Sequence, residues 1–142
     1  MINLTADSLV NTPFQWNQAQ QFRKNAESFK VDTSKQFLSN IGKFTLAYES
    51  IHALSVGLLY IHGFAPSKGP GHRATVLSLA GEELGLEPEE QAEVDDAHQK
   101  RNEMTYRSPA PPVSKQAADD LMAIAVKCLL KAKQRFPTWF ED

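Results

Sequence analysis

Polar side chains that can bind phosphate and transfer protons gather near the end of one predicted helix. His98, Arg101, Asn102, Thr105 and Tyr106 recur at helical spacing. At 100° per residue they fall within a sector of about 140° on the helix surface. Arginine presents a fork of N–H donors to a phosphate, and histidine, with an ordinary pKa near 6.5, can transfer protons at neutral pH. This pattern favours contact with a phosphate-containing ligand.

The same side of this helix also carries apolar residues. Val94 lies within the polar sector, and Ala97 and Met104 lie just beside it. A helix that only turned a charged face to water would separate the two kinds of residue. We therefore expect this side to face a cleft or a partner chain. A solvated helix end, with Arg101 paired to a carboxylate such as Asp95, would also account for these residues.

Apolar residues that recur every three or four positions predict five helices and almost no strand. Thr12-Pro13-Phe14-Gln15 predicts the start of the first helix, because threonine caps it and proline suits its first position. A second capping sequence, Thr33-Ser34-Lys35-Gln36, has a threonine cap with a glutamine three residues later. It predicts the start of the longest helix, which ends near Gly63. That helix would span about 40 Å, enough for the spine of a bundle.

Glycines, prolines and a serine bound the other three helices. Residues 63–71 form a predicted Gly/Pro loop, Gly85 stops the third helix, Pro88 starts the fourth, and Ser114 caps the fifth. The predicted spans are about 72–84, 88–106 and 114–137.

Composition limits the chain to one ordinary domain. Its 142 residues are 42% apolar and 23% charged, with a net charge of −2, so we expect one core and no surface that is basic throughout. We predict a single all-α domain over residues 1–142, with its core at about 12–137, folded as a five-helix up-and-down bundle. Any nucleic-acid contact would be confined to the region of Lys100, Arg101 and Arg107.

A reducing cytoplasm is the expected location. The one cysteine, Cys128, cannot form an internal disulfide or a multi-thiolate zinc site, and we expect it to be a buried structural thiol. No signal peptide is predicted. No membrane span is predicted either, because Lys43, Glu49 and His52 interrupt the apolar region over residues 41–61.

Other candidate groups favour structural roles. His52, His62 and His72 are dispersed and lack carboxylates at ligand spacing, so we expect packing or helix-end roles, no metal and no cofactor. The stretch over residues 68–73 is a connecting loop in our interpretation, with an anion cradle as the alternative. The tail at Trp139 either folds back on the bundle or packs on a second subunit.

The order of the elements, together with one short motif, resembles the HEPN family (higher eukaryotes and prokaryotes nucleotide-binding). The resemblance covers about residues 14–136. It rests on a short first helix, a long second helix, a Gly/Pro loop leading to Gly71-His72-Arg73, the pair Arg101-Asn102 near the end of the fourth helix, and a closing helix. The family motif carries a histidine a few residues after the arginine, and in this chain Tyr106 stands at that position.

Family members with the intact motif are metal-independent endoribonucleases, often toxins that dimerise so that two motifs line one cleft. The resemblance thus implies that Arg101 binds phosphate, that Asn102 orients the 2′-hydroxyl or the phosphate, and that Tyr106 donates a hydrogen bond or stacks on a base. A phenol with an ordinary pKa near 10 is a poor base. His98, one turn before Asn102, is our hypothesis for a substitute base.

Two functions stay open at this point. The first is a non-catalytic or weakly active HEPN-like module that binds a nucleotide or RNA, within a toxin–antitoxin or nucleotidyltransferase pair. The second is a metal-independent endoribonuclease that uses Arg101 and Asn102 at a dimer cleft. Tyr106 at the histidine position favours the first, and the retained Arg101-Asn102 pair keeps the second open. For either function we expect a homodimer, with a nucleotidyltransferase or an antitoxin as a further partner.

Overall fold

The computed structural model describes residues 9–11, 15–33, 38–67, 72–106 and 112–141, of which 9–11 and 104–106 are described by their backbone alone. Five helices account for most of these residues, which confirms the all-α expectation. The elements are β1 (Leu9–Asn11), α1 (Trp16–Thr33), α2 (Asn40–Ile61), β2 (Phe64–Pro66), α3 (Arg73–Glu83), α4 (Pro88–Tyr106), α5 (Lys115–Arg135) and the 3₁₀ helix η1 (Pro137–Phe140).

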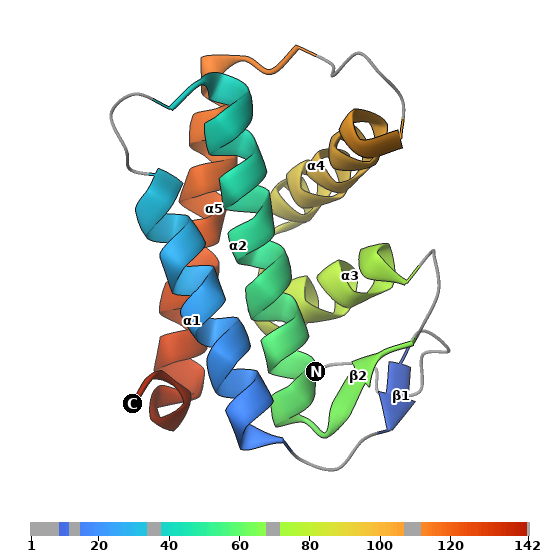
Figure 1. The fold of residues 1–142 in the computed structure, drawn as a ribbon, viewed down its shortest axis with the longest axis vertical. Helices are drawn as coiled ribbons and strands as arrows, with labels where there is room; N and C mark the ends of the chain where they lie inside the picture. The colour runs from blue at the N-terminus through green and yellow to red at the C-terminus, as the bar shows by residue number, and fades with distance from the viewer. Residues whose placement is uncertain (1–8, 12–14, 34–37, 68–71, 107–111, 142) are drawn as a thin grey trace.

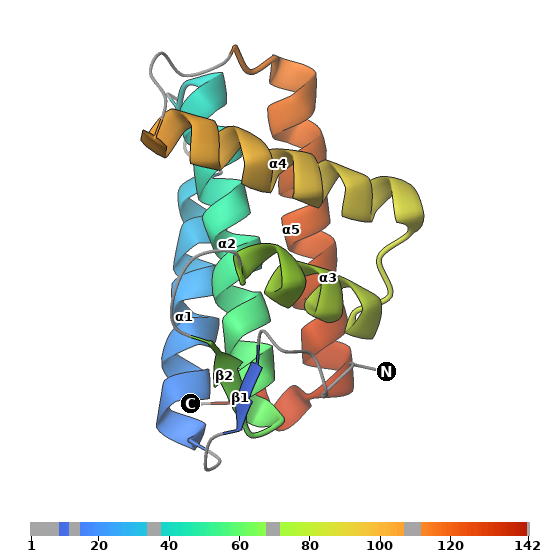
Figure 2. The same cartoon turned by 90° about the vertical axis from the view of Figure 1, so that its right-hand side faces the viewer.

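Three of the helices lie alongside one another and two lie across them. Figure 1 shows α1, α2 and α5 side by side along the long axis of the molecule. In the turned view, α3 and α4 cross α2 and α5 as an antiparallel pair (Figure 2). Helices α1 and α2 run antiparallel, but α5 runs parallel to α2 (Figure 1), and α3 and α4 form a separate crossing layer. The expected five-helix up-and-down order is therefore wrong beyond the first two helices. The crossing layer places the start of α3 and the end of α4 over α2.

The start of the longest helix differs from the prediction. Helix α1 continues to Thr33, whose hydroxyl donates to the carbonyl of Lys30 at 2.6 Å, so Thr33 is not the cap of the next helix. Helix α2 is capped instead by Ser39, whose Oγ accepts from the backbone N–H of Gly42 at 3.0 Å. Thr33 is fully buried in the last turn of α1, so the predicted helix start at Thr33 is wrong. Ser39 is not part of a capping box, because Gly42 stands three residues after it. Residues 34–37 lie outside the described part of the chain.

A short two-stranded ribbon was not predicted. β1 pairs with β2 in antiparallel register, Leu9 opposite Pro66 and Asn11 opposite Phe64. Each strand has three residues, too few for an alternating apolar pattern to be recognised. Gly63, with φ +83°, makes the turn that leads from α2 into β2.

The turn between α3 and α4 follows the predicted chemistry. Gly85 has φ +73°, and the N–H groups of Gly85 and Leu86 donate to the carbonyls of Glu82 and Gly81 at 3.2 and 2.9 Å. This is the glycine-terminated helix end that satisfies free carbonyls. Helix α4 then begins at Pro88, and the carboxylate of Glu90 accepts from the N–H of Glu87. The turn is tight, so α4 returns beside α3.

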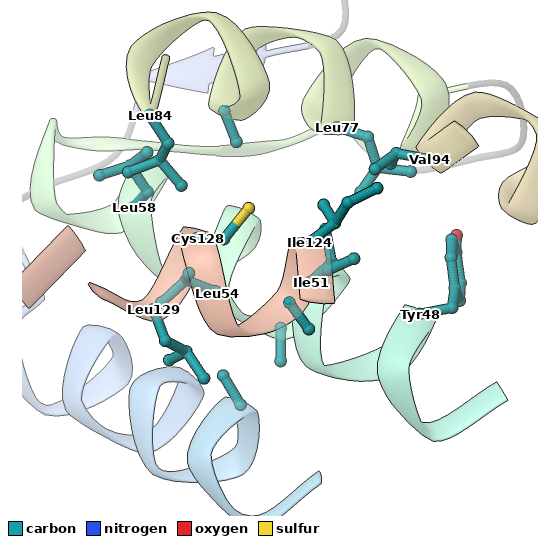
Figure 3. Packing of buried hydrophobic residues seen from close by; sticks show 14 of the residues in the cluster. Tyr48, Ile51, Leu54, Leu58, Leu77, Leu84, Val94, Ile124, Cys128 and Leu129 are labelled. Carbon is teal, nitrogen blue, oxygen red and sulfur yellow. The ribbon is translucent and has the colours of Figure 1, made fainter. Parts of the chain in front are cut away.

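One cluster of buried side chains joins all five helices. Helix α2 lies at its centre and is buried on most of its circumference, which explains why this helix is so apolar. Figure 3 shows Leu58 of α2 near Leu84, which follows α3, and Leu54 of α2 near Cys128 and Leu129 of α5. Burial of this apolar surface is the main stabilising contribution to the fold.

The core confirms one prediction about a single residue, Cys128, and decides between two alternatives for another, Trp139. Cys128 is a free, buried thiol, and burial raises its pKa to about 12. Trp139 folds back on the bundle: it is 1% exposed, and its indole N–H donates to the carbonyl of Ala19 at 2.8 Å. Arg23 donates to the carbonyl of Trp139 at 3.0 Å, so η1 is held against α1.

Helix α2 is long and apolar enough to cross a membrane by length and composition alone. Within the described residues it is the one such helix, and 67% of its most apolar window is buried inside the fold. Burial of this extent is typical of a core helix.

Candidate functional site

Polar side chains from three helices meet where the ends of α3 and α4 lie over α2. We call this group the three-helix polar cluster. Its members are Tyr48, Glu49 and His52 of α2, Arg73 of α3, and His98, Arg101 and Asn102 of α4. Figure 3 shows Tyr48 at the edge of the apolar core, with its hydroxyl directed away from the aliphatic side chains.

His98 is held by hydrogen-bond partners at both ring nitrogens. Its Nδ1 lies 3.1 Å from Tyr48 Oη, and its Nε2 lies 3.3 Å from Asn102 Nδ2. With the Asn102 amide nitrogen facing Nε2 as a donor, the matching neutral tautomer carries its ring proton on Nδ1, directed at Tyr48 Oη. The imidazole also stacks on the Tyr48 ring, with centroids 6.3 Å apart. Contacts at both ring nitrogens and on the ring face therefore hold His98 in one orientation.

The surroundings of His98 favour its neutral form. Burial lowers its pKa from the usual 6.5, and the positive charges of Arg73 and Arg101 lower it further, against the opposing effect of Asp95. At neutral pH the ring is therefore uncharged and keeps a lone pair on Nε2. An uncharged imidazole can accept a proton, as a general base must.

Two arginines from different helices approach the same carboxylate oxygen. Glu49 Oε1 lies 3.4 Å from Arg101 Nε and 3.9 Å from Arg73 Nη1. Arg73 also donates to Tyr48 Oη at 3.4 Å and lies over the Tyr48 ring, 5.9 Å from its centroid. The side chains of Glu49, Arg73 and Arg101 are 25–30% exposed. These two guanidinium groups are thus ordered but reachable from solvent.

His52 forms the inner side of the cluster. Its ring stacks on Tyr48, with centroids 6.2 Å apart. Burial lowers the pKa of His52 to about 3, with Arg73, Arg101 and His98 as further causes, so this ring is neutral at physiological pH. Burial likewise raises the pKa of Tyr48, which keeps its phenol protonated. Glu49 therefore carries the one negative charge among the seven members of the cluster.

The structure brings three of the four sequence-predicted site residues together. His98, Arg101 and Asn102 lie in the cluster, whereas the side chain of Tyr106 is outside the described part of the structure. Lys100, predicted nearby, points elsewhere: it pairs with Asp96 at 3.0 Å and lies 5.6 Å from the centroid of the Phe44 ring. Arg107 also lies outside the described residues.

Sequence reasoning missed the contributions of α2 and α3. The sequence did not predict a site role for Tyr48. In the sequence pattern Glu49 only interrupts the apolar region over residues 41–61, and His52 is expected to be a packing residue. Arg73 was part of a loop whose alternative role was to bind an anion. One signal was present: Glu49 and His52 are polar residues within the most apolar helix of the chain. A core helix tolerates such residues where they meet polar partners.

The mixed polar and apolar side of α4 is covered within the chain. Val94 and Ala97 are buried in the common core, and Arg101 meets Glu49 of α2 rather than Asp95. The expected covering surface is therefore supplied, among the described residues, by α2 and α3. The homodimer was expected because this face needs a covering surface, so that reason no longer supports it, and the homodimer stays a prediction.

Outside the cluster, the described residues offer surface hollows but no metal site. No group of three or more His, Cys, Asp or Glu side chains among them is placed to hold a metal ion. Surface hollows of about 590 and 260 Å³ lie elsewhere, and neither includes a member of the cluster. The second is lined by three carboxylates, those of Glu93, Asp96 and Asp120. Its charge does not suit a phosphate ligand.

Comparison with known proteins adds no family to this description. The chain matches no family model, no curated protein and no solved structure.

Proposed function

We propose that this chain is an HEPN-like module that binds RNA or a nucleotide through a phosphate group at the three-helix polar cluster. The observation that carries the proposal is the convergence of Arg73 and Arg101 on one oxygen of Glu49. Among the described members of the cluster, two guanidinium groups share one carboxylate, so cationic side chains outnumber the anionic one. Both side chains reach the surface, where a phosphate oxygen can approach them.

The chemistry of the donors supports phosphate as the ligand. Guanidinium groups are planar forks whose N–H donors match the oxygens of a phosphate, and their bonds to an anion are charge-assisted. Asn102 adds an amide to the same surface, one residue after Arg101. A confined site of this kind agrees with a chain whose net charge is −2. The HEPN-type fold is part of the proposal, supported by the long α2 and by Arg101-Asn102 near the end of α4.

The test is binding of a fluorescein-labelled single-stranded RNA, followed by fluorescence anisotropy at low ionic strength. We expect Arg73→Ala and Arg101→Ala each to weaken binding about tenfold or more, since each removes one phosphate contact of roughly 1.5–3 kcal/mol. Lys115→Ala is the control, because Lys115 is an exposed cation at the start of α5 that pairs with Asp119 at 2.8 Å. Equal affinity of all four proteins would contradict the proposal.

A metal-independent ribonuclease is the second candidate, and the state of His98 favours it. Once Asn102 Nδ2 gives up its contact with His98 Nε2, the neutral imidazole can take the proton of an RNA 2′-hydroxyl as that oxygen attacks the adjacent phosphorus. The P–O5′ bond breaks, and the leaving 5′-oxygen takes a proton from the imidazolium or from water. Arg101 would balance the charge that develops on the phosphate, and Asn102 would then orient the 2′-hydroxyl or the phosphate. This assigns the proton transfer to His98, in place of the histidine that Tyr106 replaces.

Cleavage in the presence of EDTA decides between binding and catalysis. If the chain is a ribonuclease, the wild type cleaves RNA without metal, leaving a 2′,3′-cyclic phosphate, and His98→Ala abolishes cleavage while RNA binding persists. If wild type and variant both bind RNA and neither cleaves it, the binding function stands alone. A homodimer, a nucleotidyltransferase or antitoxin partner and a cytoplasmic location accompany the proposal as predictions from the sequence.

A further inference from the structure

We propose that the groove between α1 and α5 is a docking site for an acidic, amphipathic helix of a partner protein. The groove is formed by the residues that line two adjoining surface hollows of about 590 and 210 Å³. Its apolar members are Val31 of α1, Val126, Leu129 and Leu130 of α5, and Phe140 of η1. The groove includes no member of the three-helix polar cluster, so the proposal is independent of the proposed function.

The groove gathers the large apolar side chains that the fold leaves exposed. Among the described residues these are Val31 and Leu130, which are 55% and 56% exposed. They belong to different helices, yet both line the hollow of about 210 Å³. Single exposed apolar residues scattered over a surface are ordinary, whereas a contiguous apolar patch marks an interaction site. The groove therefore has the character of a binding surface.

The form of the groove suits a helix as its occupant. Helices α1 and α5 lie side by side along the long axis of the molecule (Figure 1), so a third helix can lie along the groove between them. The apolar hollow, at about 210 Å³, is smaller than small-molecule sites of about 300–1,000 Å³. It has room for side chains of a partner. An amphipathic helix inserts such side chains from positions i, i+3 or i+4, and i+7.

The charges along the groove select an acidic partner. The lining residues comprise four cations and two anions, namely Arg23, Lys24, Lys30 and Lys133 against Glu27 and Asp32. Glu27 is already paired with Arg23 at 2.6 Å. Lys30 of α1 and Lys133 of α5 line the apolar hollow from its two sides, and neither forms an ion pair within the described part of the chain. Carboxylates on a docked helix can pair with both lysines.

A second copy of this chain suits the groove less well. A two-fold contact places the same surface of each copy against the other. The Lys30 and Lys133 sides of both copies would then meet, and like charges repel. An acidic helix from another protein has no such cost.

A synthetic peptide tests the proposal without an identified partner. The probe is a fluorescein-labelled peptide of about 18 residues, long enough to form a helix. It has leucines at i, i+4, i+7 and i+11, glutamates beside them and alanines elsewhere. One control peptide has the same composition in scrambled order, and the other has lysines in place of the glutamates. By fluorescence anisotropy at low ionic strength, we expect the wild type to bind the glutamate peptide about tenfold or more tightly than either control.

Variants of the groove test its apolar and charged parts separately. Leu130→Gln should weaken binding of the glutamate peptide about fivefold or more. Reversing both lysines, Lys30→Glu with Lys133→Glu, should weaken it about tenfold and strengthen binding of the lysine peptide. That gain cannot come from a misfolded protein. Lys131→Glu is the matched control, because Lys131 is exposed in the same turn of α5 as Lys133 and lines neither hollow.

Three results would overturn the proposal. The first is no binding of the glutamate peptide by the wild type up to about 1 mM, or equal binding of a control peptide. The second is an equal loss in Lys131→Glu and in the doubly reversed variant. The third comes from sedimentation velocity: if the wild type is a dimer that Leu130→Gln converts to a monomer, the groove binds a second copy. RNA binding is measured separately, so none of these results changes the standing of the proposed function.

Discussion

Tyr48 of α2 and His98 of α4 are joined by a 3.1 Å contact between Oη and Nδ1, and their rings stack with centroids 6.3 Å apart. The contact connects the central core helix to the helix that carries Arg101-Asn102. Asn102 Nδ2 lies 3.3 Å from the other ring nitrogen, so the arrangement matches a neutral ring with its proton on Nδ1. The site residues are thus positioned by a core residue and not by α4 alone.

His98 should titrate below its ordinary pKa of 6.5, because burial and two nearby arginines disfavour the imidazolium. Long-range ¹H–¹⁵N correlations measured against pH report both the midpoint and the protonated nitrogen. We expect a midpoint below 6.5 and the proton on Nδ1 in the neutral ring. Asn102→Ala should raise the midpoint, since Nε2 then no longer faces an N–H donor. A midpoint above 6.5, or a proton on Nε2, would contradict this account.

His52 should make stability depend on pH. The unfolded chain binds a proton at His52 near pH 6.5, whereas the folded chain binds it only near pH 3. The unfolded state therefore carries more protons between these values, and this contribution is complete above pH 6.5 and is lost as the pH falls toward 3. The slope for one proton is at most about 1.4 kcal/mol per pH unit.

The measurement for His52 is urea unfolding at several pH values from 7 to 4. His52→Phe keeps an aromatic ring against Tyr48 and removes the titrating group. We expect the free energy of unfolding of this variant to fall less steeply with decreasing pH than that of the wild type. Parallel pH profiles for the two proteins would show that His52 is not buried in its neutral form.

Gly57 should not tolerate a side chain. A Cβ at this position would lie 2.7 Å from Trp139 Cζ2 and 2.9 Å from Phe22 Cβ, although alanine is otherwise better than glycine in a helix. We expect Gly57→Ala to destabilise the fold by about 1–3 kcal/mol, as overpacking does. Combining it with Trp139→Phe, which shortens the ring, should cost less than the sum of the two single changes. Additive losses in chemical denaturation would place Trp139 away from α2.

Ser39→Ala should cost about 1 kcal/mol, because Ser39 caps α2 by accepting from Gly42 N–H. The comparison is Ser78→Ala, at an exposed position within α3, where alanine is neutral or slightly stabilising. Thermal or urea unfolding gives both values. Equal effects of the two substitutions would argue against a helix start at Ser39.

Much of the fold follows from local signals in the sequence. Gly85, Pro88 and Ser114 mark helix boundaries that the structure confirms, because each residue acts on the backbone beside it. The start of α2 could not be chosen in this way. Threonine and serine both cap helices, and the local sequence does not show that α1 continues to Thr33, whose side chain is fully buried in the fold.

Part of the candidate site could be predicted from the sequence, because some of its members lie on a single helix. His98, Arg101 and Asn102 lie on one helix, so their spacing alone brings them together. Glu49 and Arg73 come to the site because α3 and α4 cross α2 (Figure 2). Helical periodicity gives the faces of single helices but not the angle at which they pack. The partners supplied by other helices were therefore missed.

The most direct test of the central claim is a map of where RNA contacts the protein. Backbone amide shifts in ¹H–¹⁵N NMR spectra are recorded while a short single-stranded RNA is added, for the wild type and for Arg101→Ala. We predict that the largest shifts fall at residues 48–52, at the start of α3 and at residues 98–102, and that they vanish in the variant. Shifts that centre instead on the exposed lysines Lys131 and Lys133 of α5, unchanged by Arg101→Ala, would contradict the claim.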